Sequence, residues 1–208
     1  MATTRMWDTI HDERVKLVDD LANLSAEQWT TPSLCSDWNV QQMLGHMTAT
    51  AKMTPPKFFA KMLSAGFRFN TMSATEVARE TSGTPAQTLA EFRAHAMDST
   101  SPPGPTPSWL GETVIHSTDI RWPLGIEHEF PAEALIQVAD FYKKSNMLIG
   151  AKSRISGFKL QATDADWSTG DGPEISGPML ALVMAMTGRK TAVDRLSGSQ
   201  LDAFAARM

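Results

Sequence analysis

The chain has 208 residues, 42% of them hydrophobic and 20% charged, with a net charge of −4 at pH 7. This composition is typical of a soluble globular protein that buries a core without disulfides. Basic residues form no run longer than two, so no nucleic-acid partner is expected. The single cysteine, Cys35, fits a reducing cytoplasm. The first residues lack the apolar core of a signal peptide, and the most apolar run, residues 179–186, is too short to span a bilayer, so no membrane partner is expected.

The first 150 residues have the pattern of a helical bundle. Residues 5–24 repeat apolar side chains every three to four positions, including Val15, Leu17 and Val18, which predicts an amphipathic helix. Ser25 and Asn39 are followed three residues later by glutamine, which is the pattern of an N-terminal cap. Further helices are expected over residues 57–63, 73–80, from Thr84–Pro85 onward, 112–122 and 131–149.

The pattern changes near residue 150. Residues 158–163 alternate apolar and polar side chains, which predicts a strand, and short strands are expected at 167–169 and 174–176. A helix over 179–187 and a helical tail from 191 follow. The predicted fold class is therefore mainly α, with a helical bundle over residues 1–150 and a small α+β region over residues 151–208.

The helix over residues 112–122 carries a candidate metal site. Glu112 and His116 stand four residues apart, so their side chains rise from adjacent turns toward one point. They share a face with Ile120, whereas Val114 and Arg121 lie round the helix from it. A glutamate on such a face is costly to bury unless it is paired or binds a cation.

A third ligand has to come from another helix, and His46 is the best candidate. Histidine, glutamate and histidine would hold a divalent ion and leave one position open, as catalytic zinc sites do. Two simpler interpretations stay open at this point. His46 could be a hydrogen-bonded core or surface histidine, and Glu112 and His116 could form an exposed helix pair.

Three other residues are candidates for supporting roles. Asp119 could orient a ligand imidazole, or be an ordinary surface aspartate. Arg189 could bind an anionic substrate group, or simply end a helix. Cys35 could be a nucleophile, although a small buried thiol is the simpler interpretation.

Several stretches resemble a known family. Residues 35–46, read Cys-Ser-Asp-Trp-Asn-Val-Gln-Gln-Met-Leu-Gly-His, and residues 112–125, read Glu-Thr-Val-Ile-His-Ser-Thr-Asp-Ile-Arg-Trp-Pro-Leu-Gly, resemble the two signatures of the mycothiol-dependent maleylpyruvate isomerase family. Residues 162–178 and 187–189 resemble its carboxy-terminal region. That family belongs to the DinB/YfiT-like four-helix-bundle metalloenzymes.

The resemblance implies a metal, a cosubstrate and a reaction class. His46, Glu112 and His116 match the family's metal ligands, and Arg189 is the nearest match to a functional arginine. The implied cofactors are a divalent ion, Zn²⁺ by family type, and mycothiol, held on the metal as a nucleophilic thiolate. The implied enzyme is an isomerase or a thiol S-transferase that acts on a small electrophile.

Two alternatives to an enzyme remain: a metal-binding sensor or sequestering protein on the same bundle, and a bundle without metal in which Glu112 and His116 pair. The sequence leaves the electrophile, the native metal and the oligomeric state open, a homodimer being one option.

Overall fold

The computed structural model describes residues 2–35, 37–147 and 149–208. The chain divides into two compact units, residues 1–128 and 129–208, and each is described by itself. Among the described residues, no helix combines the length and the apolar character needed to cross a membrane.

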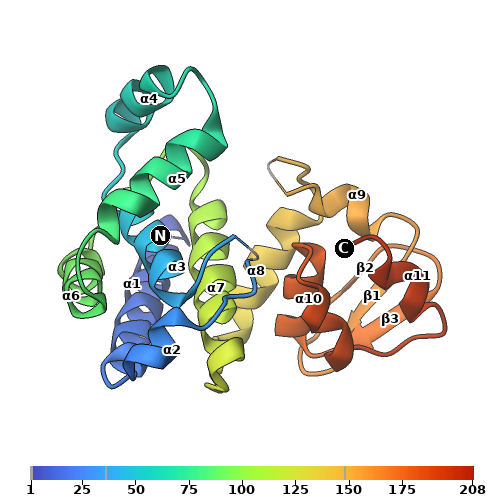
Figure 1. Ribbon diagram of the computed structural model, residues 1–208. Helices are drawn as coiled ribbons and strands as arrows, with labels where there is room; N and C mark the ends of the chain where they lie inside the picture. The colour runs from blue at the N-terminus through green and yellow to red at the C-terminus, as the bar shows by residue number, and fades with distance from the viewer. Residues whose placement is uncertain (1, 36, 148) are drawn as a thin grey trace. The chain divides into compact units, whose positions relative to one another are not determined.

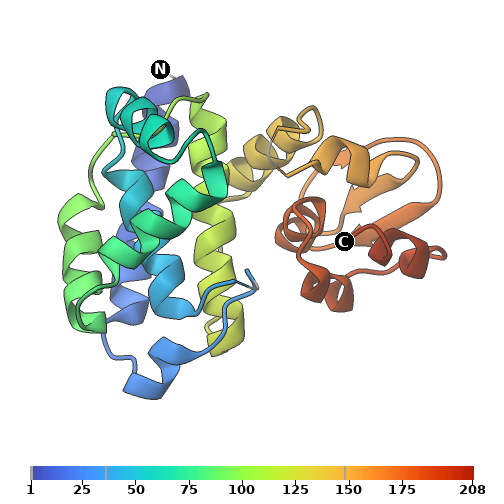
Figure 2. The ribbon, with the colours of Figure 1, turned by 45° about the horizontal axis from the view of Figure 1, so that its top comes forward.

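The N-terminal unit consists of helices and connecting loops (Figure 1). Its elements are α1 (Ala2–Leu21), α2 (Ala26–Thr30), α3 (Val40–Ala51), α4 (Pro55–Ser64), α5 (Phe69–Glu80), α6 (Pro85–His95), α7 (Thr106–Arg121) and the short 3₁₀ helix η1 (Trp122–Leu124). Helix α1 packs against α6 and α7, and α3 packs against α5, α6 and α7. Figure 2 shows α1, α3, α6 and α7 side by side as a bundle.

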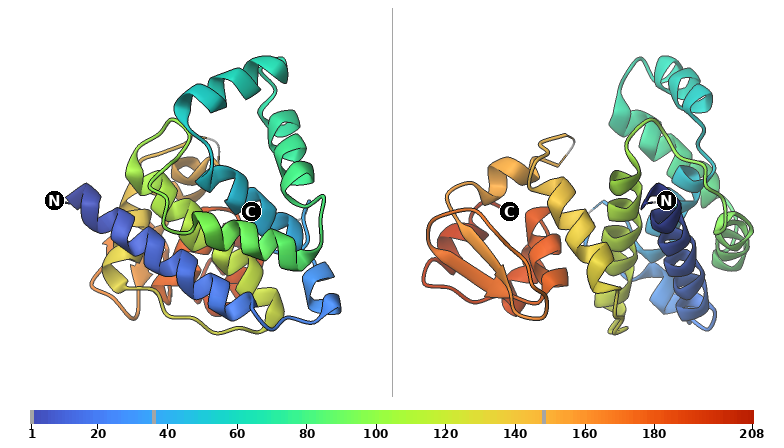
Figure 3. Two further views of the ribbon diagram at one scale, coloured as in Figure 1. Left: turned by 90° about the vertical axis from the view of Figure 1, so that its left-hand side faces the viewer. Right: turned by 180° about the vertical axis from the view of Figure 1, so that it is seen from behind.

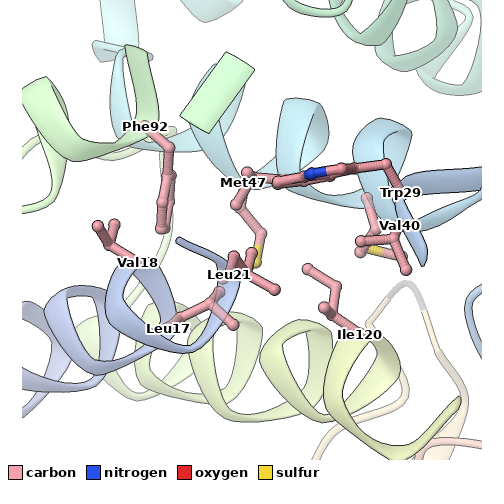
Figure 4. Packing of buried hydrophobic residues seen from close by; sticks show 10 residues of the cluster. Leu17, Val18, Leu21, Trp29, Val40, Met47, Phe92 and Ile120 are labelled. Atoms are coloured by element: carbon pink, nitrogen blue, oxygen red, sulfur yellow. The ribbon is translucent and has the colours of Figure 1, made fainter. Parts of the chain in front are cut away.

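Apolar side chains from five helices meet in the centre of this bundle (Figure 4). The cluster comprises Leu17, Val18, Leu21, Trp29, Val40, Met43, Leu44, Met47, Phe92 and Ile120. Val15, which the apolar rhythm placed among them, is instead 40% exposed. The buried position beside it is occupied by Arg14, which is 1% exposed.

The predicted helix starts depend on caps that the structure confirms. Ser25, Asn39 and Thr84 each accept a hydrogen bond from the backbone N–H three residues later, and the glutamine there bonds back to the cap. These reciprocal bonds satisfy N–H groups that a helix start otherwise leaves unpaired.

Some expected boundaries differ from the structure. Helix α5 begins at Phe69 rather than 73, and α7 begins at Thr106, because a proline such as Pro107 is tolerated in a first helical turn. The helix expected over 131–149 ends at Tyr142; Asn146 beyond it hydrogen-bonds with Ser153, a local competitor of helix formation. Leu148, within that expected helix, lies outside the described residues.

The C-terminal unit contains helices and a small sheet. Its elements are α8 (Ala132–Tyr142), α9 (Ala151–Ile155), β1 (Lys159–Ala162), β2 (Ser168–Thr169), β3 (Glu174–Gly177), α10 (Met179–Met186), the 3₁₀ helix η2 (Lys190–Arg195) and α11 (Leu201–Ala205). The described strands are ordered β2-β1-β3, with β1 antiparallel to β2 and parallel to β3. Figure 3 shows this sheet with α10 and α11 next to it.

These two units confirm the predicted fold class, a helical bundle followed by a small α+β region. The domain boundary expected at residue 150 stays a prediction. In the structure the division falls after His128, because α8 packs against α10.

A close approach of α3 and α5 gives a test of this packing. A Cβ added at Gly45 would lie 2.5 Å from Cγ2 of Thr81. We expect Gly45→Ala to lower the free energy of unfolding by about 1–2 kcal/mol, although alanine is the better helix former. Thr81→Ser removes the clashing methyl group, so the double variant should regain that loss in urea denaturation. Equal stability of the single and double variants would contradict the packing.

Candidate functional site

Helix α7 is buried on nearly every side although half its residues are polar. Its buried residues run over 110–115 and 117–121, because α1 and α3 pack on it. Val114 and Arg121, which helical geometry placed away from the site face, are 0% and 1% exposed. The interpretation of Glu112 and His116 as a water-exposed pair is therefore wrong: Glu112 is 9% exposed, and the His116 side chain is 18% exposed.

His46 and His116 come together from different helices. His46 lies on α3 and His116 on α7, and their ring centroids are 4.9 Å apart with an edge-to-face angle of 88°. On its other side His46 stacks on Trp38, with centroids 4.8 Å apart. The imidazoles of two residues that are 70 positions apart in sequence are thus in contact.

Asp119 holds the ring of His116. Its Oδ2 lies 2.9 Å from Nδ1 of His116, and its side chain is fully buried. The interpretation of Asp119 as a surface residue is wrong. Because the carboxylate accepts a hydrogen bond from Nδ1–H, it favours the tautomer whose Nε2 keeps its lone pair, which is the form that binds metals.

Glu112 completes the residues predicted for the site. Burial raises the pKa of Glu112, opposed by the nearby His116 and Arg14. The Thr113 hydroxyl lies 3.5 Å from Oε2, and the side chain of Thr50 also stabilises the carboxylate, whereas the buried Oε1 has no hydrogen-bond partner among the described residues. A carboxylate oxygen of this kind is costly to leave unpaired, and a cation would offset that cost.

Sequence reasoning missed Arg14, which lies close enough to Glu112 for each charge to affect the other. Arg14 is buried on α1, and its Nη1 donates to the backbone oxygen of Asp98 at 3.2 Å. The signal was available, since Arg14 falls between Ile10 and Val18 at the i+4 spacing of the buried stripe.

The protein environment keeps His46 neutral. Loss of hydration is the main cause that lowers the pKa of His46 to about 3, and His116 adds to it while Asp119 opposes it. A neutral imidazole is the form that a metal requires. Nevertheless, in the described part of the chain no group of three or more histidine, cysteine, aspartate or glutamate side chains is placed to hold a metal ion.

The other two candidates, Arg189 and Cys35, contact residues of their own units. Arg189 belongs to the C-terminal unit, where its Nη1 donates to the backbone oxygen of Thr187 at 3.0 Å. Cys35 is partly buried and packs against the bundle core. The remaining histidines are hydrogen-bonded: His11 with Ser99, His95 with Asp98, and His128 with Glu13.

Comparison with known proteins gives a family match for part of the chain. Residues 10–102 match the family model of the mycothiol maleylpyruvate isomerase N-terminal domain. The match lies within the N-terminal unit. The matched range includes His46 and ends before Glu112 and His116.

Solved structures show the same fold. The chain resembles the crystal structure of the mycothiol-dependent maleylpyruvate isomerase at 14% identity, and that of a histidine-to-alanine mutant at 13%. Each comparison covers 96% of this chain and 94% of the other, with a TM-score of 0.60. No curated protein sequence matches the chain.

The lowered pKa of His46 predicts acid sensitivity of the metal-free protein. In the unfolded chain His46 becomes protonated below its ordinary pKa of 6.5, whereas in the folded chain it stays neutral down to about pH 3. Stability is therefore complete above pH 6.5 and falls by at most about 1.4 kcal/mol for each pH unit below it. Urea denaturation from pH 7 to pH 4 measures this, with His46→Gln as the control that lacks the group. Parallel pH profiles for the two proteins would contradict the prediction.

Proposed function

We propose that the chain is a mycothiol-dependent enzyme that acts on a small electrophile at a divalent-metal site formed by His46, Glu112 and His116. The meeting of His46 and His116, from helices far apart in sequence, is the observation that carries this proposal. The match of residues 10–102 to the family model of the mycothiol maleylpyruvate isomerase N-terminal domain supports mycothiol as the cosubstrate.

The donor set fits a metal such as Zn²⁺. It offers a neutral His46, a His116 oriented by Asp119, and a buried oxygen of Glu112 without a partner. Two imidazoles and one carboxylate are ligands of catalytic zinc sites. Since the described side chains do not form a three-ligand group, binding by all three requires a change in side-chain positions.

When bound, the ion supplies a position at which a low-molecular-weight thiol is held as its thiolate at neutral pH. The protein then has to hold the ligands and exclude competing water. Trp38 covers one face of His46, and Asp119 fixes His116 from behind. Arg14 compensates the charge of Glu112 inside the bundle.

The chemistry that this arrangement favours is addition of sulfur to an activated double bond. A new C–S bond forms and the alkene electron pair moves onto the conjugated carbonyl, so the former double bond becomes free to rotate. Expulsion of the same thiolate restores the double bond in the other geometry. If the adduct instead takes up a proton from water at the carbon next to the carbonyl and keeps its C–S bond, the product is an S-conjugate and the enzyme is an S-transferase. Arg189 is proposed to bind an anionic group of the substrate.

Loss of a ligand tests the metal site. We expect His116→Ala to lose most of the bound Zn²⁺ and the mycothiol-dependent conversion of small electrophiles, tested with a panel that includes maleylpyruvate, while circular dichroism shows a folded bundle. His95→Ala, which removes a histidine paired with Asp98 on the same unit, is the matched control and should keep both. Metal content by elemental analysis and activity are the measurements. Thiol-dependent activity that survives in His116→Ala would refute the mechanism, and a wild-type protein without metal affinity would favour the metal-free bundle.

Loss of the orienting carboxylate tests the role of Asp119. We expect Asp119→Asn to weaken Zn²⁺ binding by about 10–100-fold, because the imidazole of His116 loses the group that fixes its tautomer. Isothermal titration of the metal-free protein measures the affinity. Activity should return when excess Zn²⁺ is supplied, which a merely misfolded variant would not show. An unchanged affinity would mean that Asp119 does not act through His116.

A further inference from the structure

The segment that joins α3 to α5 exposes large apolar side chains to solvent. Helix α4, all of whose residues are described, contains no buried residue. Figure 1 and both views of Figure 3 show it standing off from α1, α3 and α7. Phe59, Leu63 and Phe67 are 61%, 67% and 71% exposed, and Phe69 is 39% exposed. We call these four residues the apolar tip.

The backbone conformation at the end of α4 helps to keep the apolar tip exposed. Phe59 and Leu63 lie one turn apart on the same face of α4. Gly66 and Phe67 both adopt left-handed conformations, and Phe67 is the one described non-glycine residue with a positive φ. This turn ends α4 with a hydrogen bond from Phe67 N to Met62 O at 2.8 Å. A bulky residue in this conformation is unfavourable in itself, so the turn maintains an exposed phenyl ring at a conformational cost.

The charge of this segment is opposite to that of the whole chain. Between Asp37 and Glu76 the sequence has no acidic residue, although the protein carries a net charge of −4. Lys61 is paired with Glu76. Lys57 and Arg68, which flank the apolar tip, make no ion pair with any described residue. Exposed aromatic and aliphatic side chains are thus combined with two uncompensated cations.

We infer that the apolar tip is a docking surface for a membrane that contains anionic lipids. Helices with apolar residues on one side and lysine or arginine beside them lie in the headgroup region of such membranes, and this needs no membrane-spanning helix. Each cation near the surface contributes about fivefold to partitioning, and each buried phenyl ring more than that. A second copy of the chain is a poorer occupant, because a two-fold contact would bring the same cations together.

Vesicle flotation tests this inference on the full-length protein. We expect binding to vesicles of phosphatidylcholine mixed with phosphatidylglycerol, at least about tenfold weaker binding to phosphatidylcholine alone, and release by salt. The triple variant Phe59→Ser/Leu63→Ser/Phe67→Ser should lose binding by about tenfold or more. Met97→Ser is the matched control, since Met97 is 62% exposed outside the tip and its replacement should change nothing.

A charge variant separates the two components. Lys57→Gln/Arg68→Gln should bind the mixed vesicles about tenfold or more weakly, whereas Arg93→Gln, an exposed arginine on α6, should bind as the wild type does. Circular dichroism confirms that all variants are folded. Absence of binding to both vesicle types, or undiminished binding of the triple variant, would overturn the inference. A concentration-dependent dimer that the triple variant abolishes, without vesicle binding, would overturn it in favour of self-association.

Discussion

The structure depends on the burial of ionisable groups along α7. A helix packed on both sides would ordinarily be apolar, yet α7 carries Glu112, Asp119 and Arg121 into the bundle. Two of them are paired with a group at another position: Asp119 with His116, and Arg121 with Asp20 on α1 at 2.7 Å. An interior charge without such a partner is strongly destabilising, so these groups have to be placed together. The same requirement that stabilises the fold therefore concentrates reactive side chains at one place.

Glu112 is the least compensated member of this set. Its nearest charged neighbours, His116 and Arg14, only partly offset the loss of hydration that raises its pKa. Buried ionisable groups with strongly shifted pKa values are found mainly at functional sites. Asp119 is hydrogen-bonded to His116, which suits a carboxylate that orients a ligand. Oε1 of Glu112 has no hydrogen-bond partner among the described residues, which suits a proposed ligand.

Much of this could be predicted from sequence because the relevant rules are local. The caps at Ser25, Asn39 and Thr84, and the shared face of Glu112 and His116, depend on spacings of three and four residues. The pairing of His46 with His116 is not local; its prediction depends on the need for a further ligand from another helix and on the family resemblance. Arg14 was missed because an arginine within an apolar rhythm is normally assigned to the solvent side, and only the packing of α1 against α7 shows otherwise.

The loop between α2 and α3 is tied to the far end of α7. The N–H of Leu34 donates to the backbone oxygen of Asp119 at 3.1 Å, using a carbonyl that the end of the helix would otherwise leave open. Within the loop, Ser33 binds the backbone oxygen of Trp38 through both its N–H and its hydroxyl. Trp38 stacks on His46, and Asp119 hydrogen-bonds to His116. The same loop is therefore bonded to the residues that position both imidazoles. A displacement of this loop would therefore affect the positions of both imidazole rings. Substitutions in the loop can change the geometry of the histidine pair without replacing either histidine.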